Sequence, residues 1–100
     1  MKLGILVNTD RHIKHLVGIT NAAHAKGHEV SIFIMDSGTR LLSDPALREL
    51  ALLPGVRTSF CAFSAKKIGV TYEGIPPEIA AGSQVNNAIM NHHADKVIVL

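Results

Sequence analysis

Short apolar runs alternate with amphipathic stretches along the chain, and this alternation restricts the fold more than any other feature. Strands are predicted at the apolar or β-branched runs Leu3–Val7, Val30–Met35, Val56–Cys61 and Asp95–Leu100. Apolar residues at helical spacing predict helices between these runs: at about Arg11–Lys26, after Asp44 and Pro45, and from Val85 to His92. Strands that alternate with helices form a parallel sheet that is covered by helices on both faces.

The length of the chain restricts the number of domains. A chain of 100 residues has room for one core of ordinary size. We therefore expect residues 1–100 to form a single α/β domain. Its expected architecture is a three-layer α/β/α sandwich with a mostly parallel, flavodoxin-like sheet of four or five strands.

Local signals predict where several elements begin. Asp10 is the expected N-cap of the first helix, and Asp44 with Pro45 is expected to open the second. The glycine- and proline-rich stretch Gly69–Gly82 predicts a long connection, with one helical turn at Glu78–Ala81.

The strand order decides which loops meet. We expect the order 2-1-3-4, which places a switch point between the first and third strands. Ligands in such sheets bind beyond the carboxyl ends of the strands at that point. The crevice would then be lined by Asn8–His12 and Cys61–Ser64. The same order makes Val30–Met35 a long apolar edge strand, which favours self-assembly or a partner.

Composition excludes several classes of protein. Lys and Arg number 10 and Asp and Glu 8, and a formal charge of +2 is too mild to predict nucleic-acid binding. No apolar run approaches the roughly 18 residues of a membrane span, and the beginning of the chain turns polar too early for a signal peptide. A single cysteine excludes an internal disulfide, so a cytoplasmic protein is expected.

That cysteine, Cys61, ends a predicted strand at the expected switch point. A helix N-terminus or a nearby cation stabilises a thiolate, and Lys66, Lys67 and His12 are candidates for the cation. The alternative is that Cys61 is a small buried apolar side chain, as free cysteines commonly are. Position alone leaves both interpretations open.

A set of features in fixed order gives this chain a family resemblance. In chain order they are the apolar first strand, Ala25–Val30 leading into Phe33, Asp36–Gly38, Gly55 and Val56 before Cys61, Cys61–Ala65 followed by Gly69 and Val70, and Ala94–Val97. With these features the chain resembles the DsrE/DsrF/DsrH-like (TusBCD-like) family of small sulfur-relay proteins over nearly its whole length.

The resemblance implies a sulfur carrier, a possible sulfurtransferase without turnover chemistry of its own. In the family a cysteine accepts a persulfide sulfur and hands it to a partner protein, and Cys61 aligns with that cysteine. Because Cys61 is the only cysteine, the relay would be intermolecular, between a sulfur donor protein and an acceptor protein. The resemblance also implies homo-oligomers, as trimers or hexamers, or paralogous subunits, and no cofactor.

The expected site surrounds Cys61 with polar side chains. Lys66 and Lys67 would lower its pKa or contact a partner, and a pocket rim is expected at Asn8, Thr9, Asp10, His12 and Ser64.

The histidines do not predict a metal centre. His12 and His15 could join Cys61 in a Cys/His metal site, but no carboxylate or second thiol has a clear matching place. We therefore expect no metal, and expect His12 to pair with the thiolate or a bound anion. A flavin site is disfavoured because Asn8–Arg11 offers one hydroxyl and an acid, and no Trp is present.

A second function stays open beside sulfur transfer. The chain would then be a non-catalytic small-anion-binding or assembly subunit of the same fold. Thiol reactivity separates the two functions, because only a carrier needs an accessible and partly ionised Cys61.

Overall fold

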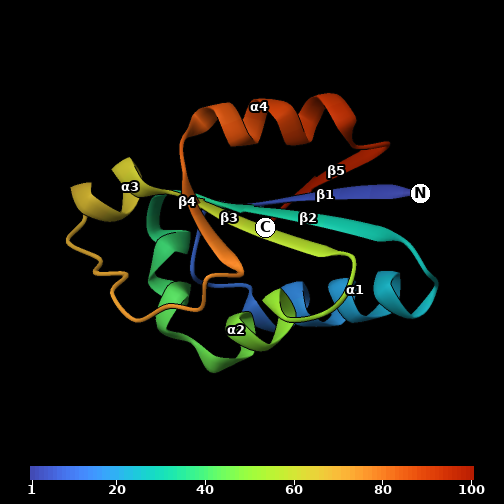
Figure 1. Cartoon of the computed structure of the whole chain (residues 1–100), viewed down its shortest axis with the longest axis horizontal. Coiled ribbons are helices and arrows are strands. Elements are labelled where there is room, and N and C mark those ends of the chain that lie inside the picture. Colours follow the sequence, from blue (N-terminus) through green and yellow to red (C-terminus); the bar gives the residue numbers. More distant parts are fainter.

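A computed structural model describes residues 1–100 as one five-stranded, all-parallel sheet with helices on both faces (Figure 1). The expected α/β/α fold class is confirmed. The elements are, in order, β1 (Lys2–Val7), α1 (Ile13–Ala25), β2 (Glu29–Ile34), the 3₁₀ helix η1 (Asp36–Ser43), α2 (Pro45–Ala51), β3 (Val56–Cys61), α3 (Ala62–Lys67), β4 (Ile79–Gly82), α4 (Gln84–His93) and β5 (Lys96–Val99).

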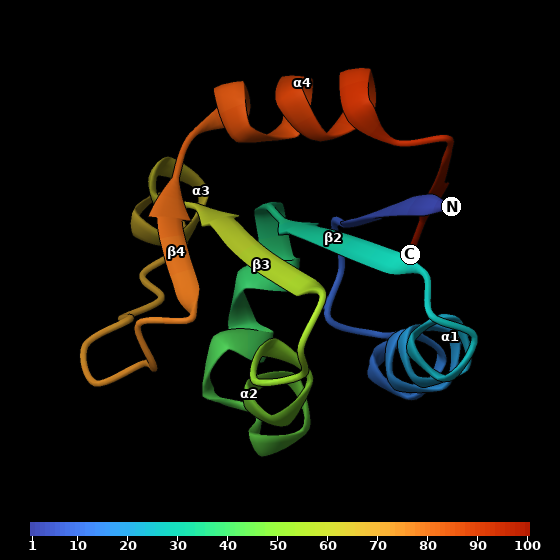
Figure 2. The ribbon, with the colours of Figure 1, turned by 45° about the vertical axis from the view of Figure 1, so that its right-hand side comes forward.

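The strand order is β4-β3-β2-β1-β5, so the expected order 2-1-3-4 is wrong. The connections from β1 to β4 all step in the same direction across the sheet. Because parallel crossovers are right-handed, they leave α1 and α2 on one face (Figure 2). The connection from β4 to β5 runs back across the sheet and puts α4 alone on the other face. Strand β2 is therefore central, and the edges are β4 and β5.

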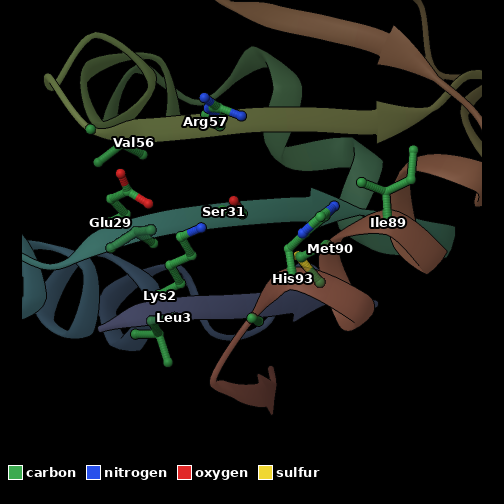
Figure 3. A pocket seen from close by; sticks show the side chains of 12 residues that line it. Lys2, Leu3, Glu29, Ser31, Val56, Arg57, Ile89, Met90 and His93 are labelled. Carbon is green, nitrogen blue, oxygen red and sulfur yellow. The ribbon is translucent and has the colours of Figure 1, made fainter.

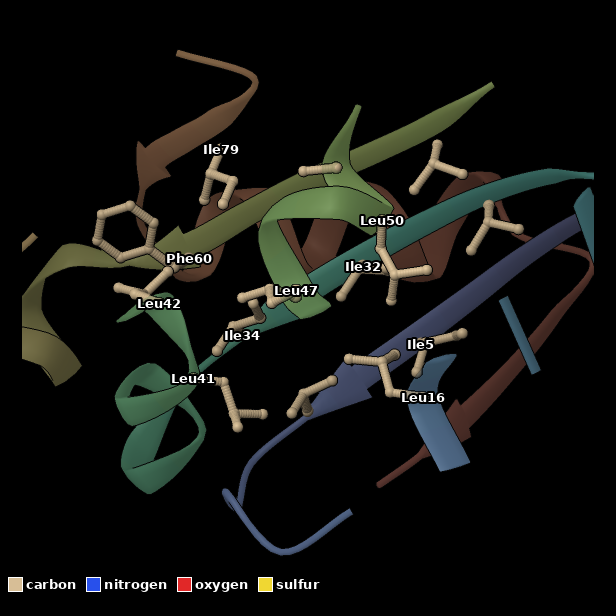
Figure 4. Close-up of a cluster of buried hydrophobic side chains, with 14 of the residues drawn as sticks. Ile5, Leu16, Ile32, Ile34, Leu41, Leu42, Leu47, Leu50, Phe60 and Ile79 are labelled. Atoms are coloured by element: carbon tan, nitrogen blue, oxygen red, sulfur yellow. The ribbon is translucent and has the colours of Figure 1, made fainter. Parts of the chain in front are cut away.

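The main core lies between the sheet and the α1/α2 face (Figure 4). Alternate strand residues point into it, among them the fully buried Ile5, Ile32 and Phe60. Leu16 of α1 and Leu47 of α2 meet them from the helix layer. Because most of the buried apolar side chains gather here, this face carries most of the hydrophobic stabilisation.

The α4 face of the sheet is more thinly covered. Met90 is the only buried residue of α4, whereas Val85 is 64% exposed and Ile89 is 53% exposed. The helix crosses the sheet over Gly4, where an added Cβ would lie 3.2 Å from the side chains of Met90 and Ala94. The absence of a side chain at Gly4 is what allows α4 to approach β1.

Sequence signals predicted some boundaries and missed others. Asp44 caps α2 as expected, because its Oδ1 accepts from the N–H of Ala46 at 2.8 Å. Asp10 caps nothing, since α1 starts at Ile13 and has His12 at its N-cap position. The turn expected at Glu78–Ala81 is the strand β4, because pairing with β3 overrides the weak local preference of this segment. No helix is long and apolar enough to cross a membrane.

Two glycines give a matched test of this packing. A Cβ at Gly38 would lie 2.7 Å from the carbonyl oxygen of Val7, whereas a Cβ at Gly18 on exposed α1 would meet nothing. We expect Gly38→Ala to lower the free energy of unfolding by about 1–3 kcal/mol because the backbone must shift. Gly18→Ala should raise it by about 0.5–1 kcal/mol. Urea titrations measure both, and equal effects of the two variants would contradict the close approach of η1 to β1.

Candidate functional site

Cys61 is the last residue of β3 and lies at the carboxyl edge of the sheet. It is paired with Gly82, the last residue of β4. The chain leaves β3 into α3 and leaves β4 into α4, which crosses the opposite face from α1 and α2. The switch point of this sheet is therefore between β3 and β4 rather than between β1 and β3. Cys61 still lies at the switch point, but its neighbours differ from those expected.

The Cys61 sulfur accepts several hydrogen bonds. It occupies the N-cap position of α3, where the N–H of Ser64 donates to Sγ at 3.4 Å. The Ser64 hydroxyl, the Gln84 carboxamide and the N–H of Phe63 are the further donors whose hydrogen bonding lowers the pKa of the thiol. Two of these donors are backbone groups and two are side chains. The sulfur thus lies between the start of α3 and the first residue of α4.

The pKa of the Cys61 thiol reflects two opposing effects. Burial raises this pKa, because it disfavours the charged thiolate. The hydrogen bonds from Ser64, Gln84 and Phe63 lower it, because they are stronger when the acceptor is an anion. The hydrogen bonds outweigh burial, so the pKa of Cys61 lies below its ordinary value. All the groups responsible are uncharged.

The cysteine side chain is covered. Cys61 is 3% exposed and packs with Phe33 and Met90 in a small cluster on the α4 face. The half-buried Met35 borders this cluster, and its Sδ accepts from Gln84 Nε2 at 3.8 Å. The sulfur is therefore screened from solvent by side chains of β2, α4 and the residue after β2.

A hollow of about 520 Å³ lies on the same face, toward the amino edge of the sheet (Figure 3). Lys2, Glu29 and Arg57 border it from the strands, and His93 borders it from the end of α4. A second hollow of about 500 Å³ adjoins it along β3. Cys61 lines neither of them. The open space on this face is thus separate from the thiol.

Comparison with known proteins identifies the family. The model of the DsrE/DsrF-like family matches residues 1–100, the whole of the sequence. The chain belongs to the DsrE/DsrF-like family. No curated protein sequence matches it.

Solved structures of other proteins share the architecture of this DsrE/DsrF-like protein. The YchN protein from E. coli superimposes with a TM-score of 0.76 at 13% identity, covering 100% of both chains. MTH1491 from Methanobacterium thermoautotrophicum, a protein of unknown function, superimposes with a TM-score of 0.71 at 14% identity. That match covers 99% of this chain and 98% of the other. At these identities the likeness shows the fold alone.

Of the residues expected around Cys61 in this DsrE/DsrF-like domain, only Ser64 touches it. Lys66 and Lys67 lie exposed on α3 and do not contribute to the lowered pKa of Cys61. The expectation that they lower it is wrong, because backbone and side-chain dipoles do so instead.

The expected rim after β1 lies elsewhere. Asn8, Thr9, Asp10 and His12 follow β1, and β2 separates β1 from β3. These residues form local contacts: Thr9 Oγ1 accepts from the N–H of Arg11 at 3.0 Å, and the His12 ring lies edge-on to that of His15 at 5.7 Å. The expected crevice with Cys61 is therefore wrong. No three His, Cys, Asp or Glu side chains come together where they could hold a metal ion.

Sequence reasoning missed Gln84 and Met35, which border Cys61 in the structure. One signal was available for Gln84. Ser83 and Asn86 have the spacing of a capping box, and each side chain bonds the other residue's backbone. That signal fixes the start of α4 at the carboxyl edge. It does not reveal that β4 is paired with β3, which is what brings Gln84 to Cys61.

The lowered pKa of Cys61 predicts how stability depends on pH. The folded state favours the thiolate, so ionisation of Cys61 adds to the free energy of unfolding. This contribution appears as pH rises through the lowered pKa of the folded state and is complete above the pKa of Cys61 in the unfolded chain. It is lost as pH falls through the folded pKa. Urea titrations of the wild type and of Cys61→Ser measure this effect. We expect the difference in free energy of unfolding, wild type minus variant, to increase with pH between the folded and the unfolded pKa of Cys61.

A matched pair of serines tests the cause. Ser64→Ala removes a donor to the sulfur and should flatten the rise. Ser59→Ala, on the same strand and the same face as Cys61, should leave it unchanged. A rise that is identical in all three backgrounds would show that Ser64 does not stabilise the thiolate.

Proposed function

We propose that this protein is a sulfur carrier, in which Cys61 accepts a persulfide sulfur and passes it to a partner protein. The observation that carries the proposal is the Cys61 thiol itself, whose pKa is lowered by hydrogen bonds from Ser64, Gln84 and Phe63. Membership of the DsrE/DsrF-like family supports it, since that family is linked to sulfur relay. A lowered pKa increases the fraction of thiolate, the form that attacks sulfur.

The proposed transfer is an exchange at sulfur. The Cys61 thiolate attacks the outer sulfur of a donor persulfide, R–S–SH. A bond forms between Cys61 Sγ and that sulfur, the donor S–S bond breaks, and the donor leaves as the thiolate RS⁻. The hydrogen remains on the transferred sulfur and ionises to give the Cys61 persulfide anion. The acceptor's thiolate repeats the attack on the outer sulfur, so no external oxidant or cofactor is needed.

Transfer requires access to the sulfur. Because Cys61 is 3% exposed, the half-buried Met35 side chain, which borders the Phe33–Cys61–Met90 cluster, must turn aside when a donor approaches. A partner would dock beside α3, where Phe63 is 74% exposed and Lys66 and Lys67 lie in solvent. In this proposal Lys66 and Lys67 contact the partner protein. Because free thiols persist in reducing compartments, we place the relay in the cytoplasm.

Sulfur loading is the direct test. Reduced protein is mixed with polysulfide and its intact mass is measured. We expect the wild type to gain one sulfur atom that dithiothreitol removes, and Cys61→Ser to gain none, because Cys61 is the only cysteine.

Two outcomes would contradict the proposal. One is equal sulfur addition to both proteins, and the other is no addition to folded wild type under conditions in which the unfolded chain is readily alkylated. The second outcome would show that Cys61 is a packing residue of the Phe33–Cys61–Met90 cluster.

A second candidate function is that of an assembly subunit, and the thin cover of the α4 face favours it. Val85 and Ile89 are exposed on α4, and Ile89 lines both hollows. Val97 and Val99 of the edge strand β5 are exposed on the same face of the sheet. Apolar side chains around an open groove are typical of a surface that another subunit covers. The expectation that β2 is an exposed edge strand is wrong, because β2 is central in the sheet. The exposed apolar side chains of the α4 face instead support the proposal of trimers or hexamers.

Sedimentation measurements test the assembly. We expect the wild type to sediment as three or six copies, and Ile89→Asp to sediment as smaller species because it places a charge on the covered face. Leu52→Asp alters another exposed apolar residue, at the end of α2 on the opposite face, and should keep the wild-type size. A wild type that is monomeric at all concentrations would exclude this candidate function.

A further inference from the structure

Three carboxamide side chains form a continuous chain of hydrogen bonds along α4. Asn91 Nδ2 donates to Asn87 Oδ1 at 2.7 Å and also to the backbone oxygen of Asn87 at 2.8 Å. Asn87 Nδ2 donates to Gln84 Oε1 at 3.2 Å. Positions 84, 87 and 91 are spaced three and four apart, so they lie along one side of the helix.

The direction of this chain is fixed by its backbone member. A backbone carbonyl oxygen can only accept, so the nitrogen end of the Asn91 amide must face Asn87. That nitrogen also donates to Asn87 Oδ1, which leaves Asn87 Nδ2 as the end that faces Gln84. Gln84 must then accept through Oε1. The donor end of its carboxamide, Nε2, is the end that remains for other partners.

The remaining partners of Gln84 are sulfur atoms. Its Nε2 donates to Met35 Sδ at 3.8 Å, beside the cluster that holds Cys61, and hydrogen bonding from its side chain lowers the pKa of the Cys61 thiol. A reversed carboxamide would direct Oε1 at these sulfurs and Nε2 at another nitrogen, which is unfavourable at both ends. The amide chain therefore aims a donor at the place where negative charge develops on Cys61.

We propose that Gln84 stabilises the sulfur anion of Cys61, as thiolate and as persulfide, and that Asn87 and Asn91 are positioning residues that hold its donor end toward the sulfur. This inference rests on the proposed sulfur transfer and names the residues that support it. Ser64 and Phe63 supply fixed donors from α3, and Gln84 supplies a donor from α4 on the other side. Because Gln84 is a long and exposed side chain, it can follow the charge outward when a second sulfur is added.

Charged side chains do not account for the stabilisation of the Cys61 thiolate. The charged or titratable side chains on the elements packed around Cys61 are Glu29 on β2, Asp36 and Arg40 on η1, Arg57 on β3, Lys66 and Lys67 on α3, and His92 and His93 on α4. None of them contributes to the lowered pKa of Cys61, whereas Gln84 does.

The test is a titration of the Cys61 thiolate by its ultraviolet absorbance, with Cys61→Ser as the blank. The readout needs no reagent to reach the buried sulfur. In Gln84→Leu we expect the midpoint to move to higher pH, with about a fivefold smaller thiolate fraction at neutral pH. Asn87→Leu should move the midpoint in the same direction by less. Asn21→Leu, an exposed amide on α1, should leave it unchanged.

A double variant separates positioning from a structural effect. Once Gln84 is leucine, Asn87→Leu should produce no further change in the midpoint, because Asn87 acts only through the Gln84 amide. A wild-type midpoint in Gln84→Leu would overturn the role of Gln84. An equal shift from Asn87→Leu with and without Gln84 would overturn the amide chain.

The titration and the sulfur-loading test fail separately. The titration uses no sulfur donor, so a shifted midpoint in a protein that gains no sulfur would reject the carrier function alone. Normal loading of a protein whose midpoint does not depend on Gln84 would reject this inference alone.

Discussion

The parallel pairing of β3 with β4 is the interaction on which the rest of the site depends. It joins Cys61 to Gly82 at the carboxyl edge and directs the next two residues, Ser83 and Gln84, across the end of β3. Since the chain then turns onto the opposite face of the sheet from α1 and α2, the pairing also creates the switch point. A four-residue edge strand with weak local propensity thus determines which groups surround the thiol.

The site balances burial against hydrogen bonding. Cys61 lies in an apolar cluster with Phe33 and Met90, and such surroundings alone favour the neutral thiol. Donors from the start of α3 and from Gln84 reverse this preference. The same residue is therefore both a packed side chain and a group that is prepared to hold negative charge. A sulfur carrier needs both properties, because its persulfide must be stable between donor and acceptor but reactive on contact.

The two faces of the sheet have different tasks. The α1/α2 face holds the large core and stabilises the domain. The α4 face is thinly packed, carries hollows along β2 and β3, and also holds the thiol at its carboxyl edge. Sulfur transfer and assembly would therefore both use the face with the less extensive packing, where side chains can move and a second protein can approach.

Local sequence signals were enough to predict the α/β class, the bounds of β3, the cap at Asp44 and the placement of Cys61 at the end of a strand. Periodicity, turn residues and caps act over a few neighbouring positions, so they can be recognised in the sequence. The strand order, in contrast, depends on the packing of the whole domain, and it separates Asn8–His12 from Cys61 and brings Gln84 toward it. The direction in which each crossover steps across the sheet leaves no local mark. It depends on how whole layers pack, and the surroundings of Cys61 depend on it.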